Sequence, residues 1–182
     1  MSSWCGEQDL NSRSIGIEIV NGGHDFPLPG NVLPPYPNVQ IDALIELVLG
    51  LLSRWTIPAH RIVGHSDIAP ARKDDPGEHF QWDRLARAGL GLWPLTISDN
   101  PLVQSDMSTK GLAGQLLKSA PPSLRGAGLQ RGSEKGAVGR MQGMLATIGY
   151  DQPETGVYDA QTEAVVRAFQ RRWVPARVPG KA

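Results

Sequence analysis

The apolar positions near the start of the chain follow first the period of a strand and then that of a helix. Residues 14–20 read SIGIEIV, so isoleucine recurs at every second position and three isoleucines share one face of a predicted strand. Glu18 lies on the opposite face, as a carboxylate within a β-rich run. Residues 38–55 then carry apolar side chains at helical spacing, which predicts a helix that is covered on more than one face.

Stretches rich in proline and glycine separate the next elements. Residues 21–37 hold five prolines and three glycines, which predicts a long surface loop. Residues 61–64 predict a short strand that leads into a second loop over residues 65–77, and residues 82–88 predict a short helix. The order strand, helix, strand, helix favours an α/β layer.

The C-terminal part is small and helical. Its two predicted helices are marked by two sets of apolar residues, Val138, Met141, Leu145 and Ile148, and then Val165, Val166, Phe169 and Trp173. Residues 94–135 are rich in proline, glycine and serine, which indicates a linker with one short candidate helix over residues 109–119. We therefore divide the chain into a first domain (1–94), a linker (95–134) and a second domain (135–182). Because two short helices bury little between them, this second domain lacks a third element.

Composition and charge exclude several classes of protein. Lysine plus arginine and aspartate plus glutamate number 18 each, so the formal net charge is zero, which argues against a nucleic-acid binder. Cys5 is the only cysteine, so the chain forms no internal disulfide and no cysteine-rich zinc module. The most apolar stretch, residues 43–52, is interrupted by Glu46 and is far shorter than the roughly 20 residues of a membrane span. The first nine residues show no export signal.

The candidate chemistry rests on four polar residues, namely Glu18, His65, Lys73 and Asp75. Zinc hydrolases use histidine nitrogens and carboxylate oxygens as three protein ligands and leave a fourth position for a water, whose pKa the metal lowers. In this hypothesis His65 and Asp75 bind Zn²⁺. Glu18 then acts as the general base, and Lys73 stabilises the oxyanion. The residue types alone leave alternatives open: Asp67 in place of Asp75, a plain hydrogen-bonded histidine–aspartate pair, or a glutamate that faces solvent.

Two stretches carry a specific pattern: residues 11–21 read NSRSIGIEIVN, and residues 64–77 read GHSDIAPARKDDPG. Together with GLWP at residues 91–94, they resemble the zinc-dependent N-acetylmuramoyl-L-alanine amidases of type 2, which are related to the peptidoglycan recognition proteins. The resemblance covers roughly residues 2–94. It implies an α/β fold with a mixed β-sheet flanked by helices. It also implies hydrolysis of the amide bond between N-acetylmuramic acid and L-alanine, in peptidoglycan or in muropeptides.

The same resemblance implies roles for individual residues. His65 and Asp75 match the second and third zinc ligands of the family. Glu18 matches the catalytic glutamate, and Lys73 matches the lysine that stabilises the tetrahedral intermediate. These roles agree with those that the chemistry of the side chains suggests.

One family feature has no match in this chain. The family's first zinc ligand is a histidine on an early strand, upstream of the matching glutamate. Trp4 and Gly6 align with a family segment that follows this histidine, so we expect the catalytic domain to be incomplete at its N-terminus. The chain offers four weak substitutes, namely His24, His60, His79 and Cys5. Without a third ligand, the alternative function is a peptidoglycan-binding protein that does not cleave.

The C-terminal part also carries a pattern, since residues 141–150 read MQGMLATIGY and residues 155–162 read TGVYDAQT. It resembles the three-helix peptidoglycan-binding domain, in which Asp159 would cap the following helix. The third helix of that family should follow near the end of this chain, so we expect an incomplete C-terminus too, and we expect Arg171 and Arg172 to be solvated. Such a module would add a second attachment to the polymeric wall. The compartment stays open, because the substrate favours the cell envelope whereas the chain shows no export signal.

Overall fold

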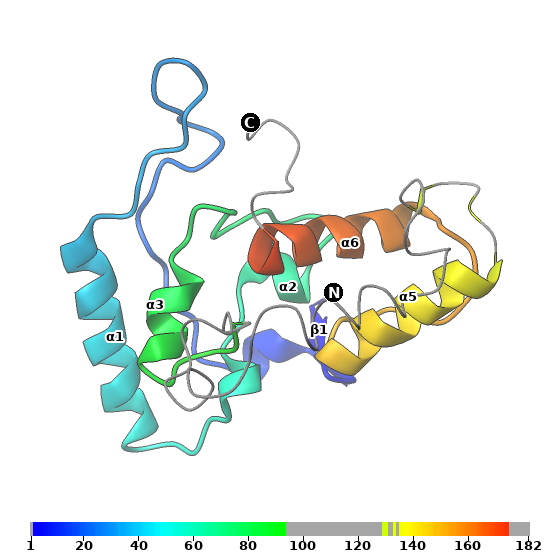
Figure 1. The fold of residues 1–182 in the computed structure, drawn as a ribbon. Helices are drawn as coiled ribbons and strands as arrows, with labels where there is room; N and C mark the ends of the chain where they lie inside the picture. The colour runs from blue at the N-terminus through cyan, green and yellow to red at the C-terminus, as the bar shows by residue number, and fades with distance from the viewer. Residues whose placement is uncertain (1, 94–128, 131–132, 134, 175–182) are drawn as a thin grey trace, which may run out of the picture.

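The computed structural model of the protein describes residues 2–93, 129–130, 133 and 135–174. Its elements, in chain order, are β1 (Ser3–Trp4), β2 (Glu7–Gln8), a 3-10 helix (Leu10–Ser12), α1 (Asn38–Leu52), a second 3-10 helix (Ala59–Arg61), α2 (His65–Ile68), α3 (Trp82–Arg87), α5 (Lys135–Ile148) and α6 (Ala160–Trp173). Helices α1 and α3 lie on one side of the molecule and α5 and α6 on the other, with α2 and the strands between them (Figure 1).

β1 and β2 form an antiparallel hairpin in which Trp4 pairs with Glu7. The two connecting residues, Cys5 and Gly6, both have positive φ, 50° and 77°. A two-residue turn with this backbone matches the twist of the strands that it joins. This hairpin is the one sheet within the described residues, and helices flank it, so the predicted α/β class is confirmed.

Residues 14–20 do not form the predicted strand and run without regular secondary structure after Ser14. Ile17 and Ile19 are half-buried against the core, as the alternation predicts, and Glu18 is exposed. Among the described residues no second strand pairs with this segment, so its N–H and C=O groups have no ladder to join. The predicted alternation of side chains is therefore confirmed at residues 17–19 but not at Ile15, which is 47% exposed, and the predicted strand is wrong.

The strand predicted over residues 61–64 is also wrong. The backbone N–H of Ile62 donates to the carbonyl oxygen of Ala59 (3.1 Å), so the chain makes a 3-10 turn where an extended strand was expected. His65 then begins helix α2 instead of a loop. Residues 69–77, which follow α2, contain turns and no regular element, as predicted.

Helix α1 confirms the predicted helix and ends three residues before the predicted end. Its buried residues Ile41, Leu44 and Val48 repeat at helical spacing. They join a core cluster whose other members come from α3 and the loops, namely Tyr36, Phe80, Trp82, Leu85 and Leu90. The short helix predicted over residues 82–88 is confirmed as α3 and supplies two of these residues.

Helices α5 and α6 confirm the two helices predicted for the C-terminal part. The Asp159 carboxylate caps α6 by accepting a hydrogen bond from the N–H of Thr162 (2.8 Å), and this bond lowers the pKa of Asp159. The buried Gln142 side chain on α5 donates to the hydroxyl of Thr162 (2.9 Å) and accepts from the N–H of Gly156 (2.9 Å). These bonds fix the turn between the two helices against both of them.

The third element that the C-terminal helices need comes from the N-terminal part of the chain. A second core cluster combines Trp4 with residues of the two helices and of the turn after α5, namely Leu145, Tyr150, Val165 and Ala168. Trp4 packs edge-to-face on Tyr150 with 5.0 Å between ring centroids, and the N–H of Cys5 donates to the carbonyl oxygen of Gly149 (2.8 Å). The hairpin β1–β2 therefore covers the face that the sequence analysis left without a partner.

The predicted linker (95–134), including its candidate helix (109–119), lies outside the described residues except at 129–130 and 133. The expected position of a third helix near the end of the chain also lies outside them. In the ranges that the structure does describe, no helix is long and apolar enough to cross a membrane.

Candidate active site

One hollow of about 510 Å³ is lined by all four residues with predicted chemical roles, Glu18, His65, Lys73 and Asp75. A larger hollow of about 1410 Å³ shares the first three of them and extends to apolar side chains of α1. Glu18 and Lys73 are exposed, so a molecule in the smaller hollow can reach both side chains. The fold therefore brings these four residues to one place, and their individual roles remain predictions.

His65 and Asp75 are in direct contact. His65 Nδ1 lies 2.5 Å from Asp75 Oδ2, and 38% and 53% of the two side chains are exposed, so a ligand can reach both. The N–H of Ser66 donates to the backbone carbonyl oxygen of Asp75 (2.9 Å), which fastens the turn that carries Asp75 to the start of α2. This backbone hydrogen bond therefore keeps the His65 and Asp75 side chains close to each other.

Close packing of the backbone allows this contact. Pro76 lies directly against Gly64, because a Cβ atom at Gly64 would come within 2.6 Å of Pro76 Cδ. The Tyr36 hydroxyl donates to the carbonyl oxygen of Pro76 (2.9 Å). Burial, with a smaller contribution from the charge of Asp75, raises the pKa of Tyr36 to about 12, so this hydroxyl remains a donor at neutral pH. Gly64 and Tyr36 therefore hold the Asp75 turn beside His65.

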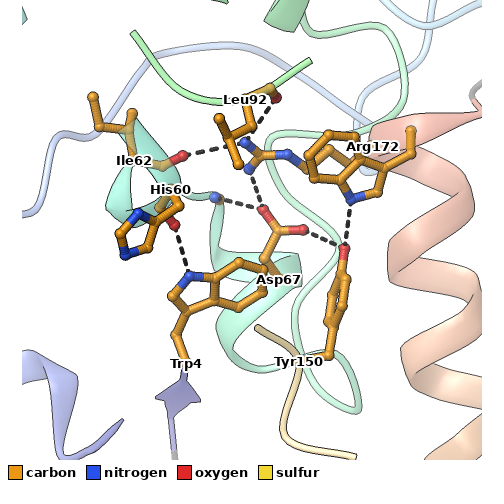
Figure 2. Close-up of polar contacts among 9 residues, drawn as sticks. Trp4, His60, Ile62, Asp67, Leu92, Tyr150 and Arg172 are labelled. Atoms are coloured by element: carbon orange, nitrogen blue, oxygen red, sulfur yellow. Dashed lines mark hydrogen bonds and ion pairs between the residues drawn. The ribbon is translucent and has the colours of Figure 1, made fainter. Parts of the chain in front are cut away.

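Asp67, the alternative to Asp75, is fully engaged elsewhere. Only 1% of it is exposed, and Figure 2 shows its carboxylate at the centre of a set of hydrogen bonds. Its Oδ1 accepts from the Tyr150 hydroxyl (2.8 Å), and its Oδ2 accepts from the N–H of Gly64 (2.9 Å) and from Arg172 Nη1 (2.6 Å). A carboxylate with both oxygens occupied is not available to a metal ion, so the structure removes Asp67 from the candidate ligands.

Zinc requires three protein ligands and an open position in a catalytic site. His65 and Asp75 fit zinc in chemical type, and they would supply two of the three ligands. In the structure Nδ1 and Oδ2 lie 2.5 Å apart, at hydrogen-bond distance, and both would have to separate to about 3.3 Å to bind one tetrahedral zinc ion. Within the described residues, no group of three or more histidine, cysteine, aspartate or glutamate side chains is placed to hold a metal ion. The residues present thus fit part of a zinc site.

Of the four substitute ligands, His24 lines the same hollow as His65 and Asp75, and His60, His79 and Cys5 do not. His24 Nε2 faces Glu78 Oε2 at 3.2 Å, and the ring of His79 stacks on Tyr36 with 5.0 Å between centroids. His60 lies in the second 3-10 helix, on the side of Trp4, whose Nε1 donates to the His60 carbonyl oxygen (2.8 Å). Cys5 lies exposed in the hairpin turn. None of these side chains joins His65 and Asp75 in a group of three among the residues that the structure describes.

Sequence reasoning missed the role of the two arginines at the end of α6. We expected Arg171 and Arg172 to be solvated, but only 12% and 3% of their side chains are exposed. The expectation is wrong because these residues pack against the N-terminal part of the chain. A signal was present: Arg172 follows the fully buried Val165 and Ala168 at positions i+7 and i+4, so it lies on the buried face of the helix.

Two family comparisons cover separate parts of the chain. Residues 2–78 match the family described as N-acetylmuramoyl-L-alanine amidase, and residues 134–173 match the putative peptidoglycan binding domain. AmiD, an N-acetylmuramoyl-L-alanine amidase of Escherichia coli, is 44% identical over 94 residues. These residues cover 52% of this chain and 34% of AmiD, so the chain spans about a third of the length of this curated relative.

Solved structures resemble the chain over nearly its whole length. The structure of Escherichia coli AmiD with the substrate anhydro-N-acetylmuramic acid-L-Ala-D-gamma-Glu-L-Lys has a TM-score of 0.66 at 31% identity, and the match covers 100% of this chain and 61% of that chain. AmpDh3 from Pseudomonas aeruginosa, in complex with anhydromuramic pentapeptide, has a TM-score of 0.65 at 32% identity and is covered to 60%, with 97% of this chain matched. Both similarities extend across the N-terminal part and the C-terminal helices.

Proposed function

Since residues 2–78 match the N-acetylmuramoyl-L-alanine amidase family, and residues 134–173 match the family of the putative peptidoglycan binding domain, we propose that this chain cleaves muropeptides or peptidoglycan. The bond cleaved is the amide between N-acetylmuramic acid and L-alanine. The ligands of the two similar structures, a muropeptide in each case, support this substrate class. The single observation that carries the proposal is the hollow that gathers Glu18, His65, Lys73 and Asp75.

Zn²⁺ is the metal that this proposal assigns to His65 and Asp75, together with a third protein ligand that the described residues do not supply. When bound, zinc would polarise the amide carbonyl and make hydroxide available near neutral pH. Glu18 would accept the proton of the attacking water and donate it to the nitrogen of L-alanine as the C–N bond breaks. The ammonium group of Lys73 would stabilise the negative charge that develops on the carbonyl oxygen. The products are a free muramic acid carboxylate and a free stem peptide.

The proposed division of labour places the chemistry in residues 1–94 and attachment to the wall in residues 135–182, with residues 95–134 as the linker. A second attachment point raises the effective concentration of a catalytic unit on a polymeric substrate. Cleavage of soluble muropeptides would be accelerated little by a second attachment point, so the higher cleavage rate should appear with intact wall.

A second candidate function is binding without cleavage. The observation that favours it is the ligand count, because His65 and Asp75 give two zinc ligands in the described part of the chain where a catalytic zinc needs three. A pocket of this kind would bind a muropeptide and leave its amide bond intact.

Incubating the full chain with a defined muropeptide, with and without added Zn²⁺, separates the two functions. We expect mass spectrometry to detect free stem peptide only when zinc is present. Calorimetry on the same samples measures binding independently of cleavage. A muropeptide that binds but stays intact at saturating zinc would contradict the amidase proposal and favour the binding function, and no binding at all would contradict both.

Replacing Asp75 by alanine is expected to weaken zinc binding by more than about 10-fold, because a metal ligand contributes at least as much as the groups that merely orient ligands. The measurement is zinc affinity by competition with a chromogenic chelator. Asp83 is a matched control, because it is an aspartate of similar exposure on α3, is paired with Arg87, and is absent from the residues that line either hollow. If Asp75→Ala binds zinc as tightly as Asp83→Ala and the unaltered protein do, Asp75 is not a zinc ligand.

A further inference from the structure

Asp67 follows His65 by two residues in α2, and its carboxylate is buried in the protein. A buried carboxylate is tolerated only where charged or polar donors replace the water that it has lost. One of its donors, the N–H of Gly64, belongs to the same segment of chain. The other two, Arg172 and the Tyr150 hydroxyl, come from the C-terminal part, so the two parts of the chain share this charge (Figure 2).

Arg172 ties three separate segments of the N-terminal part together. Besides its bond to Asp67, its Nη2 donates to the carbonyl oxygens of Ile62 (3.2 Å) and Leu92 (3.3 Å). The guanidinium group also lies over the ring of Trp82, 3.8 Å from its centroid. Only a planar group with several fixed donors makes all these contacts at once, and lysine cannot reproduce them.

Tyr150 completes the enclosure of the carboxylate. Its hydroxyl donates to Asp67 and accepts from Trp173 Nε1 (3.3 Å). Burial and the charge of Asp67 raise the pKa of Tyr150, so the hydroxyl keeps its proton and remains a donor at neutral pH. The ring of Tyr150 also packs edge-to-face against the ring of Trp4.

The bonds to Asp67 bear directly on the position of His65. Both residues belong to α2, which has four residues and begins with His65. The Asp67 carboxylate accepts the N–H of Gly64, which precedes His65, and so fixes the first turn of this helix. A helix this short does not hold its shape on its own, so its orientation depends on the groups around it.

A second contact from α6 reaches the residue that precedes the other predicted ligand, Asp75. Arg171 Nη1 lies 2.5 Å from Asp74 Oδ1, next to Asp75 in the chain. The Asp74 side chain is 59% exposed, so solvent screens this ion pair and its contribution is the smaller of the two. The end of α6 nevertheless contacts both segments that carry the predicted ligands.

We propose that Arg172 and Tyr150 are positioning residues of the candidate zinc site, so that the C-terminal helices form part of this site in addition to attaching the protein to peptidoglycan. They act on His65 through the Asp67 carboxylate and the start of α2. The inference rests on the proposed function, because it takes His65 and Asp75 as zinc ligands.

The test uses two readouts on the full chain, zinc affinity by chelator competition and the amide NMR signal of Gly64 in the zinc-free protein. Arg172→Met should weaken zinc binding by about 10- to 100-fold, as loss of groups that orient metal ligands does, and should shift the Gly64 signal. Arg172→Lys keeps the positive charge but lacks the planar guanidinium group with its several donors, so it should bind zinc more tightly than Arg172→Met and less tightly than the unaltered protein. Tyr150→Phe removes one donor and should weaken zinc binding less than Arg172→Met.

Arg167→Met is the matched control, because Arg167 lies on the same helix with 58% of its side chain exposed and should change neither readout. The proposal is overturned if Arg172→Met keeps its circular dichroism spectrum and binds zinc like the unaltered protein with an unmoved Gly64 signal. Should Arg172→Met unfold, Tyr150→Phe decides by the same two readouts. An unaltered protein that binds no zinc would contradict the proposed function, and the Gly64 signal would still test whether the start of α2 depends on Arg172.

Discussion

Replacing Glu18 by glutamine is expected to lower the rate of muropeptide hydrolysis by about 10²- to 10⁴-fold, the usual contribution of a general acid or base. Glutamine keeps the size of the side chain but cannot take up the proton of the attacking water. Glu18 is exposed and lines the same hollow as His65 and Lys73, so the change should leave the packing intact. Free stem peptide measured by mass spectrometry reports the rate, and calorimetry should show unchanged binding of zinc and muropeptide.

Glu46→Gln is the control for this prediction. Glu46 is an exposed glutamate on α1 and is absent from the residues that line either hollow near the site. It should cleave at the rate of the unaltered protein. Cleavage by Glu18→Gln at that same rate would mean that another group moves the proton.

Replacing Gly64 by alanine is expected to separate His65 from Asp75 and to weaken zinc binding by about 10-fold or more. The backbone of Gly64 (φ −92°, ψ 165°) is open to any residue, so alanine causes no strain there by its conformation. Its methyl group would instead lie 2.6 Å from Pro76 Cδ, and the Asp75 turn would have to move. Such overpacking also costs about 1–3 kcal/mol of stability, which thermal unfolding would show.

Gly50→Ala gives the matched control, because a Cβ there meets nothing within 4 Å and the residue lies in α1. Alanine should stabilise that helix by about 0.5–1 kcal/mol and leave zinc binding unchanged. If Gly64→Ala binds zinc as tightly as Gly50→Ala does, the close contact with Pro76 does not set the separation of the two predicted ligands.

The helices were predictable because their hydrogen bonds close within one segment of chain. Residues 38–52, 135–148 and 160–173 show apolar positions at helical spacing, and no distant residue is needed to satisfy their backbone. A strand depends on a partner that its own sequence does not specify. The alternation in residues 14–20 thus reported correctly that Ile17 and Ile19 face the core, was wrong for the exposed Ile15, and could not report whether a ladder forms there.

In the candidate site, too, the features set by local sequence were predictable and those set by distant residues were not. The residues proposed for the chemistry could be named from two short stretches of sequence, since their types and spacing carry the pattern of a known family. The bond between Asp67 and Arg172 joins positions 105 residues apart, and nothing local announces it. Only the spacing of Arg172 from Val165 and Ala168 indicated that its side chain points inward.

The bond between Asp67 and Arg172 has a practical consequence for anyone who shortens this protein. Deleting α5 and α6 would remove the wall-binding candidate and, in the same cut, strip a buried carboxylate of its cation, a loss of about 3–5 kcal/mol in comparable cases. It would also bare the faces of Trp4 and Trp82 that Tyr150 and Arg172 cover. Lower activity of such a fragment on intact wall would therefore not measure affinity for the wall. Point substitutions on the outer faces of the two helices would test that affinity without disturbing the buried carboxylate.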